Sequence, residues 1–366
     1  MKPTLIHIIA SNVWTGRDRY ALDICRHFSS QGWRVAVLTR DARAVDSFFK
    51  AHSIPLLHAP LDSWSDWRAI MRLRREIRIN RRGGTIIHAH RYRDALRALI
   101  ARALSGKAAK TARIVVTRHT SLRADSNPIY RFIYRSVDAH IFMSQFSLDR
   151  FLAGRPDNCD KNAMLVGGSL FPDDVAPDDI DVVAEPQRGP RFATYNGRLM
   201  EGKGLEVLID ALSLLPDLRI RLRICGTGNP DYVDRLRQRA ISRGVMERID
   251  WHRRYDQTPV TINESVFGVF PAVRPECFGL NLLQFMANGR PVITTVGSAP
   301  GEYLTDGVDA LLVRPGDATQ LAAAIRKMTQ NGDFRRKLGA NALHTFRSRL
   351  GWNDYIARLS QAYGLK

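Results

Sequence analysis

The stretch RPECFGLNLLQFMANGRPVITT, residues 274–295, sets the pattern of the whole chain. A loop bounded by prolines carries Glu276, and a helix is expected to start near Phe278. The apolar residues from Pro291 to Thr295 then have the composition of a buried strand. A loop, a helix and a strand in this order are typical of parallel sheets with helices on both faces.

The same alternation extends outward in both directions. On either side in the C-terminal half, we predict strands at 192–195, 219–225 and 266–270, with helices at 205–215, 232–243 and 318–329. The N-terminal half has predicted strands at 5–9, 35–38, 85–87, 114–116 and 140–143, and a helix at 20–30. Two α/β domains in series predict a cleft, with ligands bound beyond the carboxyl ends of the strands.

The alternation breaks at residues 171–190, which are acidic and rich in proline. Such a composition indicates a linker between domains. We therefore predict an N-terminal domain at 1–170, this linker, and a C-terminal domain at 191–349.

Composition restricts the class of protein. The chain has 366 residues, of which 45% are hydrophobic, and no apolar run is long enough to span a membrane. Its first ten residues lack the features of a signal peptide, so we expect a cytoplasmic protein. The four cysteines are scattered without a CxxC pair, which predicts small buried side chains rather than a zinc site or disulfides.

The formal charge of +19 predicts contact with a polyanion, which could be nucleic acid, an acidic lipid surface or a phosphorylated glycan. No zinc finger, aromatic RNA-binding motif or helix-turn-helix is present, so we expect no nucleic-acid binding. The basic stretch at 67–82 is expected to be helical. It could be an ordinary sheet-covering helix, or its face from Arg68 to Arg82 could attach the protein peripherally to an anionic membrane.

The segment from Gly197 to Gly204 follows a predicted strand and opens a helix. Glycines let a ligand approach the backbone, and helix N-termini favour anions. Arg198 and Lys203 add positive charge where a departing diphosphate would gain negative charge. A basic surface turn is the alternative interpretation of this segment.

The loop at Glu276 suits a sugar nucleotide. Its carboxylate can accept hydrogen bonds from sugar hydroxyls, and the amides of Phe278, Gly279 and Leu280 can meet phosphate. Gly226 begins a Gly-Thr-Gly turn that we place near the donor nucleotide. A dehydrogenase fingerprint is disfavoured there because Asp231 stands in place of the third glycine.

Taken in order and spacing, these segments resemble the retaining GT-B glycosyltransferases of glycosyltransferase family 4. That family includes many lipopolysaccharide, capsule and phosphatidylinositol mannosyl transferases. The matching features are the phosphate-clamping pair at 197–204, an E-x7-E segment from Glu276 to Gln284, the G-x-P-V entry at 289–292, and a DG…LLV-x-PGD stretch at 306–317. Gln284 departs from the family's second glutamate, which usually grips ribose, although an amide keeps an acceptor oxygen.

The resemblance implies an α/β, GT-B fold with two Rossmann-like domains facing across a cleft, and a final helix at 350–366 that returns to the first domain. It implies transfer, with retention, from a nucleotide-diphosphate sugar to a bacterial envelope glycan or lipid-linked acceptor, as in lipopolysaccharide, capsule or exopolysaccharide synthesis. Neither a metal nor a cofactor is expected, because Arg198, Lys203 and helix N-termini can supply the charge. The donor-binding residues would be Gly16, Gly197, Arg198, Lys203, Gly226, Glu276, Phe278, Gly279, Leu280 and Gln284.

In the first domain the resemblance is partial. Of the family's two glycines beside the diphosphate only Gly16 is present. His119 lies in a segment similar to the catalytic histidine, so the implied catalytic set is His119, Glu276, Arg198 and Lys203. Acceptor contacts are assigned to Thr15, Arg17, His90 and Arg118.

Alternatives stay open for the histidines and for the function. His119, His88 and His90 could be satisfied structural histidines at strand ends. The chain could also be a nucleotide-sugar-processing enzyme of the same fold, such as a non-hydrolysing epimerase, and a nucleic-acid-binding protein that uses the charge of +19 is the weaker rival.

Overall fold

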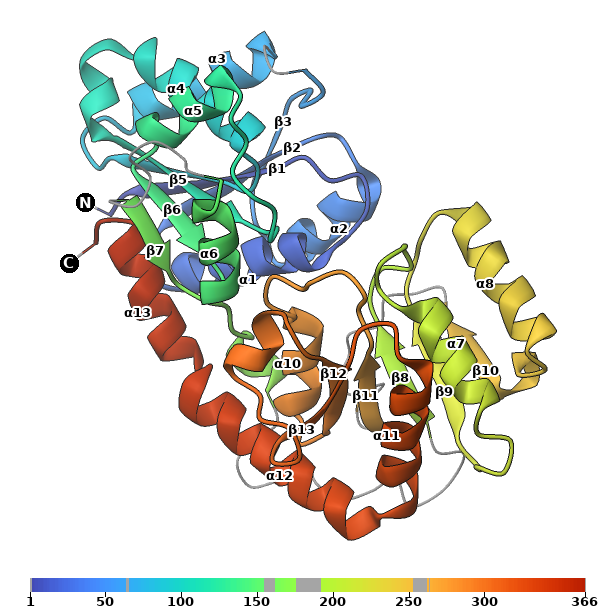
Figure 1. The fold of residues 1–366 in the computed structure, drawn as a ribbon. Helices are drawn as coiled ribbons and strands as arrows, with labels where there is room; N and C mark the ends of the chain where they lie inside the picture. Colours follow the sequence, from blue (N-terminus) through green and yellow to red (C-terminus); the bar gives the residue numbers. More distant parts are fainter. Residues whose placement is uncertain are drawn as a thin grey trace. The chain divides into compact units, whose positions relative to one another are not determined.

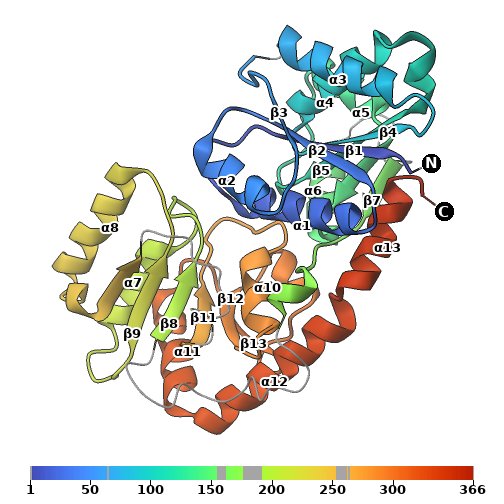
Figure 2. The same ribbon diagram turned by 180° about the vertical axis from the view of Figure 1, so that it is seen from behind.

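A computed structural model of the chain describes residues 2–63, 66–154, 162–175, 192–252, 262 and 264–365. The chain divides into two compact units, with Met1–Gly168 and Tyr355–Lys366 in unit 1 and Ser169–Asp354 in unit 2. Each unit is a parallel sheet covered by helices (Figures 1 and 2), which confirms the predicted class of two Rossmann-like α/β units. Most of the predicted linker at 171–190 lies outside the described residues.

Unit 1 contains a seven-stranded sheet in the order β3-β2-β1-β4-β5-β6-β7. Its strands are β1 Thr4–Ile9, β2 Arg34–Thr39, β3 Leu56–His58, β4 Thr85–Ala89, β5 Ala112–Arg118, β6 Ala139–Phe142 and β7 Ala163–Leu165. Its helices are α1 Gly16–Ser30, α2 Arg43–Ala51, α3 Trp67–Ile79, α4 Tyr92–Ala103, α5 Pro128–Ser136, α6 Gln145–Leu152 and the greater part of α13 Trp352–Ala362, with η1 at Gly106–Thr111.

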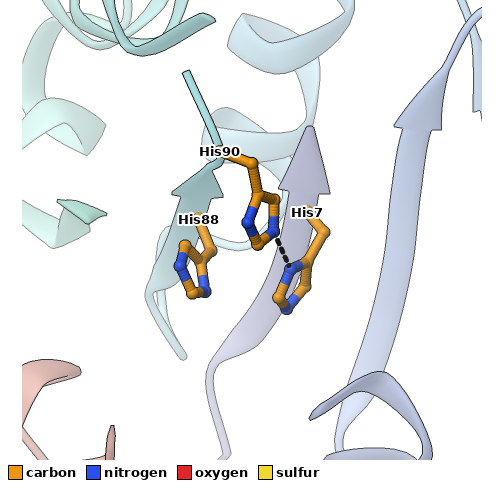
Figure 3. A group of neighbouring side chains, drawn as sticks. All are labelled: His7, His88 and His90. Carbon is orange, nitrogen blue, oxygen red and sulfur yellow. Dashed lines mark hydrogen bonds between the residues drawn. The ribbon is translucent and has the colours of Figure 1, made fainter. Parts of the chain in front are cut away.

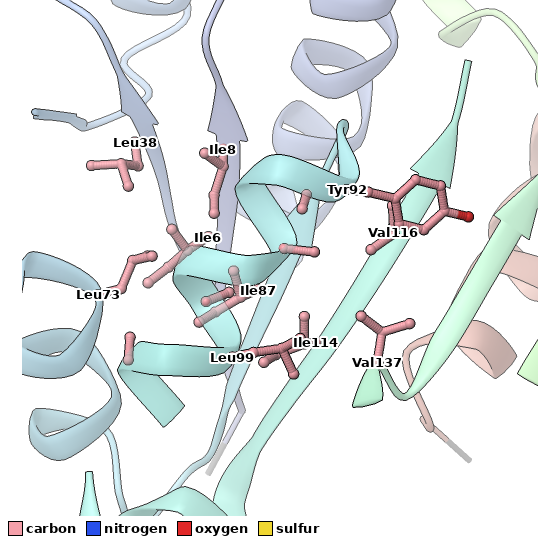
Figure 4. Packing of buried hydrophobic residues seen from close by; sticks show 14 of the residues in the cluster. Ile6, Ile8, Leu38, Leu73, Ile87, Tyr92, Leu99, Ile114, Val116 and Val137 are labelled. Atoms are coloured by element: carbon pink, nitrogen blue, oxygen red, sulfur yellow. The ribbon is translucent and has the colours of Figure 1, made fainter. Parts of the chain in front are cut away.

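The two faces of this sheet differ in chemistry. Alternate residues of a strand point to opposite faces, and Ile6 and Ile8 of β1 pack into an apolar cluster with Leu73 of α3 and Leu99 of α4 (Figure 4). Burial of each such side chain stabilises the fold by about 1.5–3 kcal/mol. His7 therefore points to the other face, where α1 and α13 lie.

Unit 2 contains a six-stranded sheet in the order β10-β9-β8-β11-β12-β13. Its strands are β8 Phe192–Asn196, β9 Arg221–Cys225, β10 Ile249–His252, β11 Ser265–Phe270, β12 Val292–Thr295 and β13 Ala310–Val313. Its helices are α7 Leu205–Ser213, α8 Pro230–Ser242, α10 Leu280–Met286, α11 Ala318–Gln330 and α12 Gly332–Arg349, with short turns η3 Pro172–Asp174, η4 Met246–Arg248 and η5 Ala299–Glu302.

Among the helices that begin at other residues than predicted, two have a clear local reason. Helix α1 begins at Gly16 rather than near residue 20, because Thr15 and Asp18 form a capping box. Helix α10 begins at Leu280 rather than near Phe278, because Gly279 has the left-handed φ of 92°. Within the described parts of the chain, no helix has both the length and the apolar composition needed to cross a bilayer.

Candidate active site

Three loops follow strand ends of the unit 2 sheet and hold one another through backbone hydrogen bonds. The amide of Gly197, after β8, donates to the carbonyl of Cys225 at 3.0 Å. The carbonyl of Gly202 accepts from the amides of Val273 and Arg274 at 2.9 and 3.0 Å. The loop before α7 is thereby fixed to the loop that carries Glu276.

Two glycines allow this close approach. A Cβ atom on Gly204, whose φ is +74°, would lie 1.8 Å from the carbonyl oxygen of Pro271. A Cβ atom on Gly226 would lie 1.9 Å from the carbonyl oxygen of Gly197. Both distances are far below any van der Waals contact, so these positions require glycine for the loops to meet.

The loop contacts bring together two of the predicted catalytic side chains. Lys203 Nζ donates to Glu276 Oε1 at 2.5 Å, and the two side chains keep 30% and 20% of their surface exposed. The Arg198 side chain is exposed and has no hydrogen-bond or ion-pair partner among the described residues. One cation of the predicted pair is therefore matched with a carboxylate, and the other is open to an anionic ligand.

Phe278 contributes through its backbone rather than its ring. The ring is buried against Tyr303, whose hydroxyl donates to the Phe278 carbonyl at 2.6 Å. This packing fixes the turn of Gly279 from which α10 begins. Any contact of Phe278 with a donor would be made by main-chain atoms.

Gln284 has the chemistry expected of a ligand-binding amide. It is only 4% exposed, and its Oε1 has no hydrogen-bond partner within the described chain. A buried acceptor without a partner costs about 1–3 kcal/mol. A ribose hydroxyl that donated to Oε1 would remove that cost, so the residue fits the role implied for it.

Substitution at Gln284 should separate nucleotide binding from helix packing. We expect Gln284→Glu to keep activity, because a carboxylate still accepts from ribose, and Gln284→Leu to weaken donor binding about tenfold, as loss of one hydrogen bond does. Isothermal titration with the donor nucleotide measures both. Met286→Leu, a buried change on the same helix, is the control, and donor affinity unchanged in Gln284→Leu would assign Gln284 to packing alone.

The corresponding loop of unit 1 is organised by Asp18, which the sequence analysis did not single out. Its buried carboxylate accepts from the amide and hydroxyl of Thr15 at 2.8 and 2.6 Å, and from Ser11 Oγ at 2.6 Å. Arg17 Nη2 donates to the same serine hydroxyl at 2.5 Å. The spacing of Thr15 and Asp18, typical of a capping box, was the available signal.

The histidines of unit 1 form a chain of hydrogen bonds. His7 Nδ1 lies 2.9 Å from His90 Nε2 (Figure 3), and His90 Nδ1 lies 2.9 Å from His119 Nε2. His88 Nε2 instead lies 2.6 Å from Thr117 Oγ1, and its Nδ1 lies 2.7 Å from the hydroxyl of Tyr363. His90 thus contacts the predicted catalytic histidine, whereas His88 connects α13 to the sheet.

These rings could also ligate a metal ion. One ring nitrogen from each of His7, His88 and His90 lies within 4.8 Å of the others. All three rings are buried, and the nitrogens of His88 and His90 are engaged in the hydrogen bonds described above. Metal binding at this place would require those bonds to be exchanged.

The histidine chain is uncharged at neutral pH. Burial lowers the pKa of His7 and of His119 to about 3, and the positive charge of Arg17 contributes at His119. Burial also holds the pKa values of His88 and His90 well below the usual range. His119 can therefore orient a substrate as a neutral hydrogen-bonding group but has no extra proton to give.

A cavity of about 450 Å³ in unit 1 gathers most of the residues predicted there. Its lining includes Arg17, His90, Arg118 and His119, but not Thr15. The Arg118 guanidinium donates to the carbonyls of residues 122 and 123 at 2.8 and 3.0 Å and lies over the Phe151 ring. Arg118 thus also holds the wall of the cavity in place.

Comparison with known proteins gives matches in both units. The model "Glycosyltransferase Family 4" matches residues 14–159, and the model "Glycosyl transferases group 1" matches residues 178–345. A lipopolysaccharide core biosynthesis glycosyltransferase, LpsE of Rhizobium meliloti, is 30% identical over 41% of this chain and 42% of that protein. Glycogen synthase of Mycobacterium tuberculosis is 27% identical over 49% of this chain and 43% of that protein. The chain thus matches less than half the length of each of these curated relatives.

Solved structures match along nearly the full chain. Anabaena HepE in complex with UDP and glucose superposes with a TM-score of 0.83 at 18% identity, covering 98% of this chain and 99% of that one. WaaG, a glycosyltransferase involved in lipopolysaccharide biosynthesis, superposes with a TM-score of 0.67 at 15% identity, covering 99% and 100%. At these identities the likeness establishes the fold.

Proposed function

We propose that this chain, which has the GT-B glycosyltransferase fold with a glycosyltransferase family model matched in each unit, transfers a sugar from a nucleotide-diphosphate donor to a bacterial envelope glycan or lipid-linked acceptor. The observation that carries the proposal is the contact of Lys203 with Glu276, in a loop that also carries Arg198, whose side chain has no partner among the described residues. The two cations can bind phosphate, and the carboxylate can accept hydrogen bonds from sugar hydroxyls. Together they are suited to a ligand that contains both groups.

The donor would bind through unit 2. The diphosphate would take Lys203 and Arg198 as counter-charges, which frees the Glu276 carboxylate to accept hydrogen bonds from the sugar. Gln284 Oε1 would accept from the ribose. Two solved structures of the same fold hold UDP, which supports a uridine donor as the first to test.

Transfer would then proceed with retention at the anomeric carbon. The bond from that carbon to the diphosphate oxygen breaks while the acceptor hydroxyl oxygen forms a new bond from the same face. The departing phosphate accepts the hydroxyl proton. Arg198 and Lys203 stabilise the charge that develops on the phosphate, without a metal ion in this scheme, and neutral His119 orients the sugar and the acceptor.

A panel of nucleotide sugars, read by release of nucleoside diphosphate, tests the proposal. We expect one donor to be hydrolysed slowly without acceptor, and the same rate in the presence of a chelator. Anomeric analysis of the transferred sugar tests retention. Release of diphosphate from no member of the panel would contradict the assignment, and interconversion of donor sugars without transfer would favour an epimerase.

We also propose that the protein is cytoplasmic and that it attaches peripherally to an anionic membrane leaflet. The arginines of α3 divide between two sides of the helix, and Arg81 follows just beyond its end at Ile79. Arg74, Arg78 and Arg81 line a cavity of about 500 Å³ together with Lys107. Ile79 and Leu104 line the same cavity and are 57% and 42% exposed. This side therefore combines cations with exposed apolar groups, as protein surfaces that bind membranes do.

Vesicle sedimentation should show this attachment. The chain is expected to bind acidic but not neutral vesicles, and to be released as salt rises, because screening shortens from about 10 Å at 0.1 M to about 3 Å at 1 M. The triple change Arg74→Gln, Arg78→Gln, Arg81→Gln should weaken binding by roughly 3 kcal/mol, about 1 kcal/mol for each charge. Sedimentation that does not depend on lipid charge would rule out the attachment.

A further inference from the structure

Another basic cavity of unit 1, of about 900 Å³, lies apart from the cavity that contains His119. Asn12, Arg40 and Ala59 line it, and each of them stands just beyond the end of β1, β2 or β3. Helix α3 forms the remaining wall. The cavity is therefore at the carboxyl edge of the sheet, where ligands of parallel α/β units bind.

Three arginines of α3 line this cavity. Arg68, Arg72 and Arg75 are spaced four and three residues apart, so they project from one side of the helix. All three are exposed, and none has a hydrogen-bond or ion-pair partner within the described residues. Three guanidinium groups are thus available to a ligand in the cavity.

The fourth arginine of the cavity is already matched. Arg40 Nη2 lies 2.7 Å from Asp62 and 3.1 Å from the carbonyl of Leu61, and its Nη1 donates to Asn12 at 3.1 Å. Asp41 also lines the cavity, so four arginines face two aspartates. The excess of two positive charges equals in magnitude the negative charge of a phosphate monoester dianion.

We infer that this cavity binds a phosphate group of the acceptor, which makes the acceptor a phosphorylated glycan. The inference rests on the proposed function. Guanidinium groups bind phosphate oxygens through paired N–H donors, and three on one helix face can surround a single phosphate.

The position of the cavity also indicates the length of the acceptor. Strand β1 separates β2, which ends at this cavity, from β4, which ends at His90. Two strand spacings amount to about 10 Å. The phosphate would therefore lie at least one sugar away from the hydroxyl that reacts beside His119.

A lipid headgroup offers the same phosphate chemistry, but the cavity favours the glycan. Its lining includes two aspartates and the polar Asn12, and an acidic lipid surface would meet those carboxylates as well as the arginines. The other side of α3 presents cations with apolar residues and no acidic lining residue. The two sides of one helix are thus suited to different ligands.

Calorimetric titration with glucose 6-phosphate, with glucose as the uncharged control, tests the inference. The cavity variant carries Arg68→Gln, Arg72→Gln and Arg75→Gln. The matched variant carries Arg74→Gln, Arg78→Gln and Arg81→Gln. It removes the same charge at the same sequence spacing, two arginines from the other side of α3 and one just beyond its end at Ile79. All titrations are made on the Arg198→Ala background, so that the donor site contributes less, and circular dichroism verifies folding.

We expect glucose 6-phosphate to bind the matched variant as it binds the parent, and the cavity variant at least tenfold more weakly. Glucose should bind none of them measurably. Vesicles of phosphatidylglycerol provide the lipid arm, in which the cavity variant should sediment like the parent. An equal loss of glucose 6-phosphate affinity in both triple variants would show that only net charge matters, and it would overturn the inference. Unchanged affinity in the cavity variant, or a loss of binding seen only with vesicles, would overturn it as well.

The failure of this inference can be told from failure of the proposed function. Hydrolysis of the donor does not involve the arginines of α3 in the proposed mechanism, so it is expected to be unchanged in the cavity variant without the Arg198 substitution. If no donor is hydrolysed by the unmodified chain, the transferase proposal fails whatever the titrations show. If hydrolysis is present and the titrations show no specific loss, only the phosphorylated acceptor is wrong.

Discussion

Alanine at Arg198 or at Lys203 is expected to slow sugar transfer by about 100-fold or more, because each change removes one fixed positive charge from the departing diphosphate. The cause of the lost activity should differ between the two variants. Arg198 is exposed and its side chain is unpaired among the described residues, so its loss acts on the ligand alone. Loss of Lys203 also leaves the Glu276 carboxylate without the cation that lies 2.5 Å away.

Steady-state kinetics and thermal unfolding together test this expectation. Tm should hardly change in Arg198→Ala, since substitutions of exposed residues usually alter stability by less than about 0.5 kcal/mol. Arg314→Ala is the matched control, because Arg314 is an exposed arginine of the same unit that pairs with Asp317 on the surface. Turnover at the wild-type rate in both Arg198→Ala and Lys203→Ala would remove the phosphate clamp from the mechanism.

Mild acid is expected to unfold unit 1 before unit 2. Burial lowers the pKa values of His7, His88, His90, His119 and His140 in the folded chain. A histidine in the unfolded chain has a pKa near 6.5. Below that pH the unfolded state binds protons that the folded state does not bind, so the free energy of unfolding decreases as the pH falls. Each such group costs about 1.4 kcal/mol between pH 7.5 and 5.5, and the set together costs several kcal/mol.

Hydrogen exchange as a function of pH locates this effect. Exchange in the unit 1 strands should accelerate below about pH 6.5, while unit 2 is the internal control because its histidines, His252 and His344, are exposed. His140→Asn should make the urea midpoint depend less steeply on pH, because about one proton fewer is taken up on unfolding. His344→Asn should leave the pH dependence unchanged. Parallel loss of protection in both units would contradict the buried-histidine explanation.

The secondary structure was largely predictable because local pattern determines it. The run 192–195 is part of β8, and the run 266–270 is part of β11. Deviations occurred where one residue overrides periodicity, as Gly279 does by its left-handed φ. The predicted chemistry of Arg198, Lys203 and Glu276 likewise came from local composition beside strand ends.

The contacts that turn these residues into a site were not predictable from local pattern. Lys203 and Glu276 are 73 residues apart, and His7 and His90 are 83 residues apart. Their proximity depends on the order of strands in each sheet, which periodicity does not encode. The unpartnered oxygen of Gln284 could be recognised only once its surroundings were known.

The return of α13 to unit 1 has a consequence for synthesis on the ribosome. Tyr363 contacts His88, and Tyr355 packs against Tyr20, so residues 355–365 complete the histidine face of the first sheet. All of unit 2, residues 169–354, is translated between the two parts of unit 1. At about 5–20 residues per second this interval lasts roughly ten to forty seconds. During it the nascent first unit has an uncovered polar face, so the unit that emerges first is the one that is finished last.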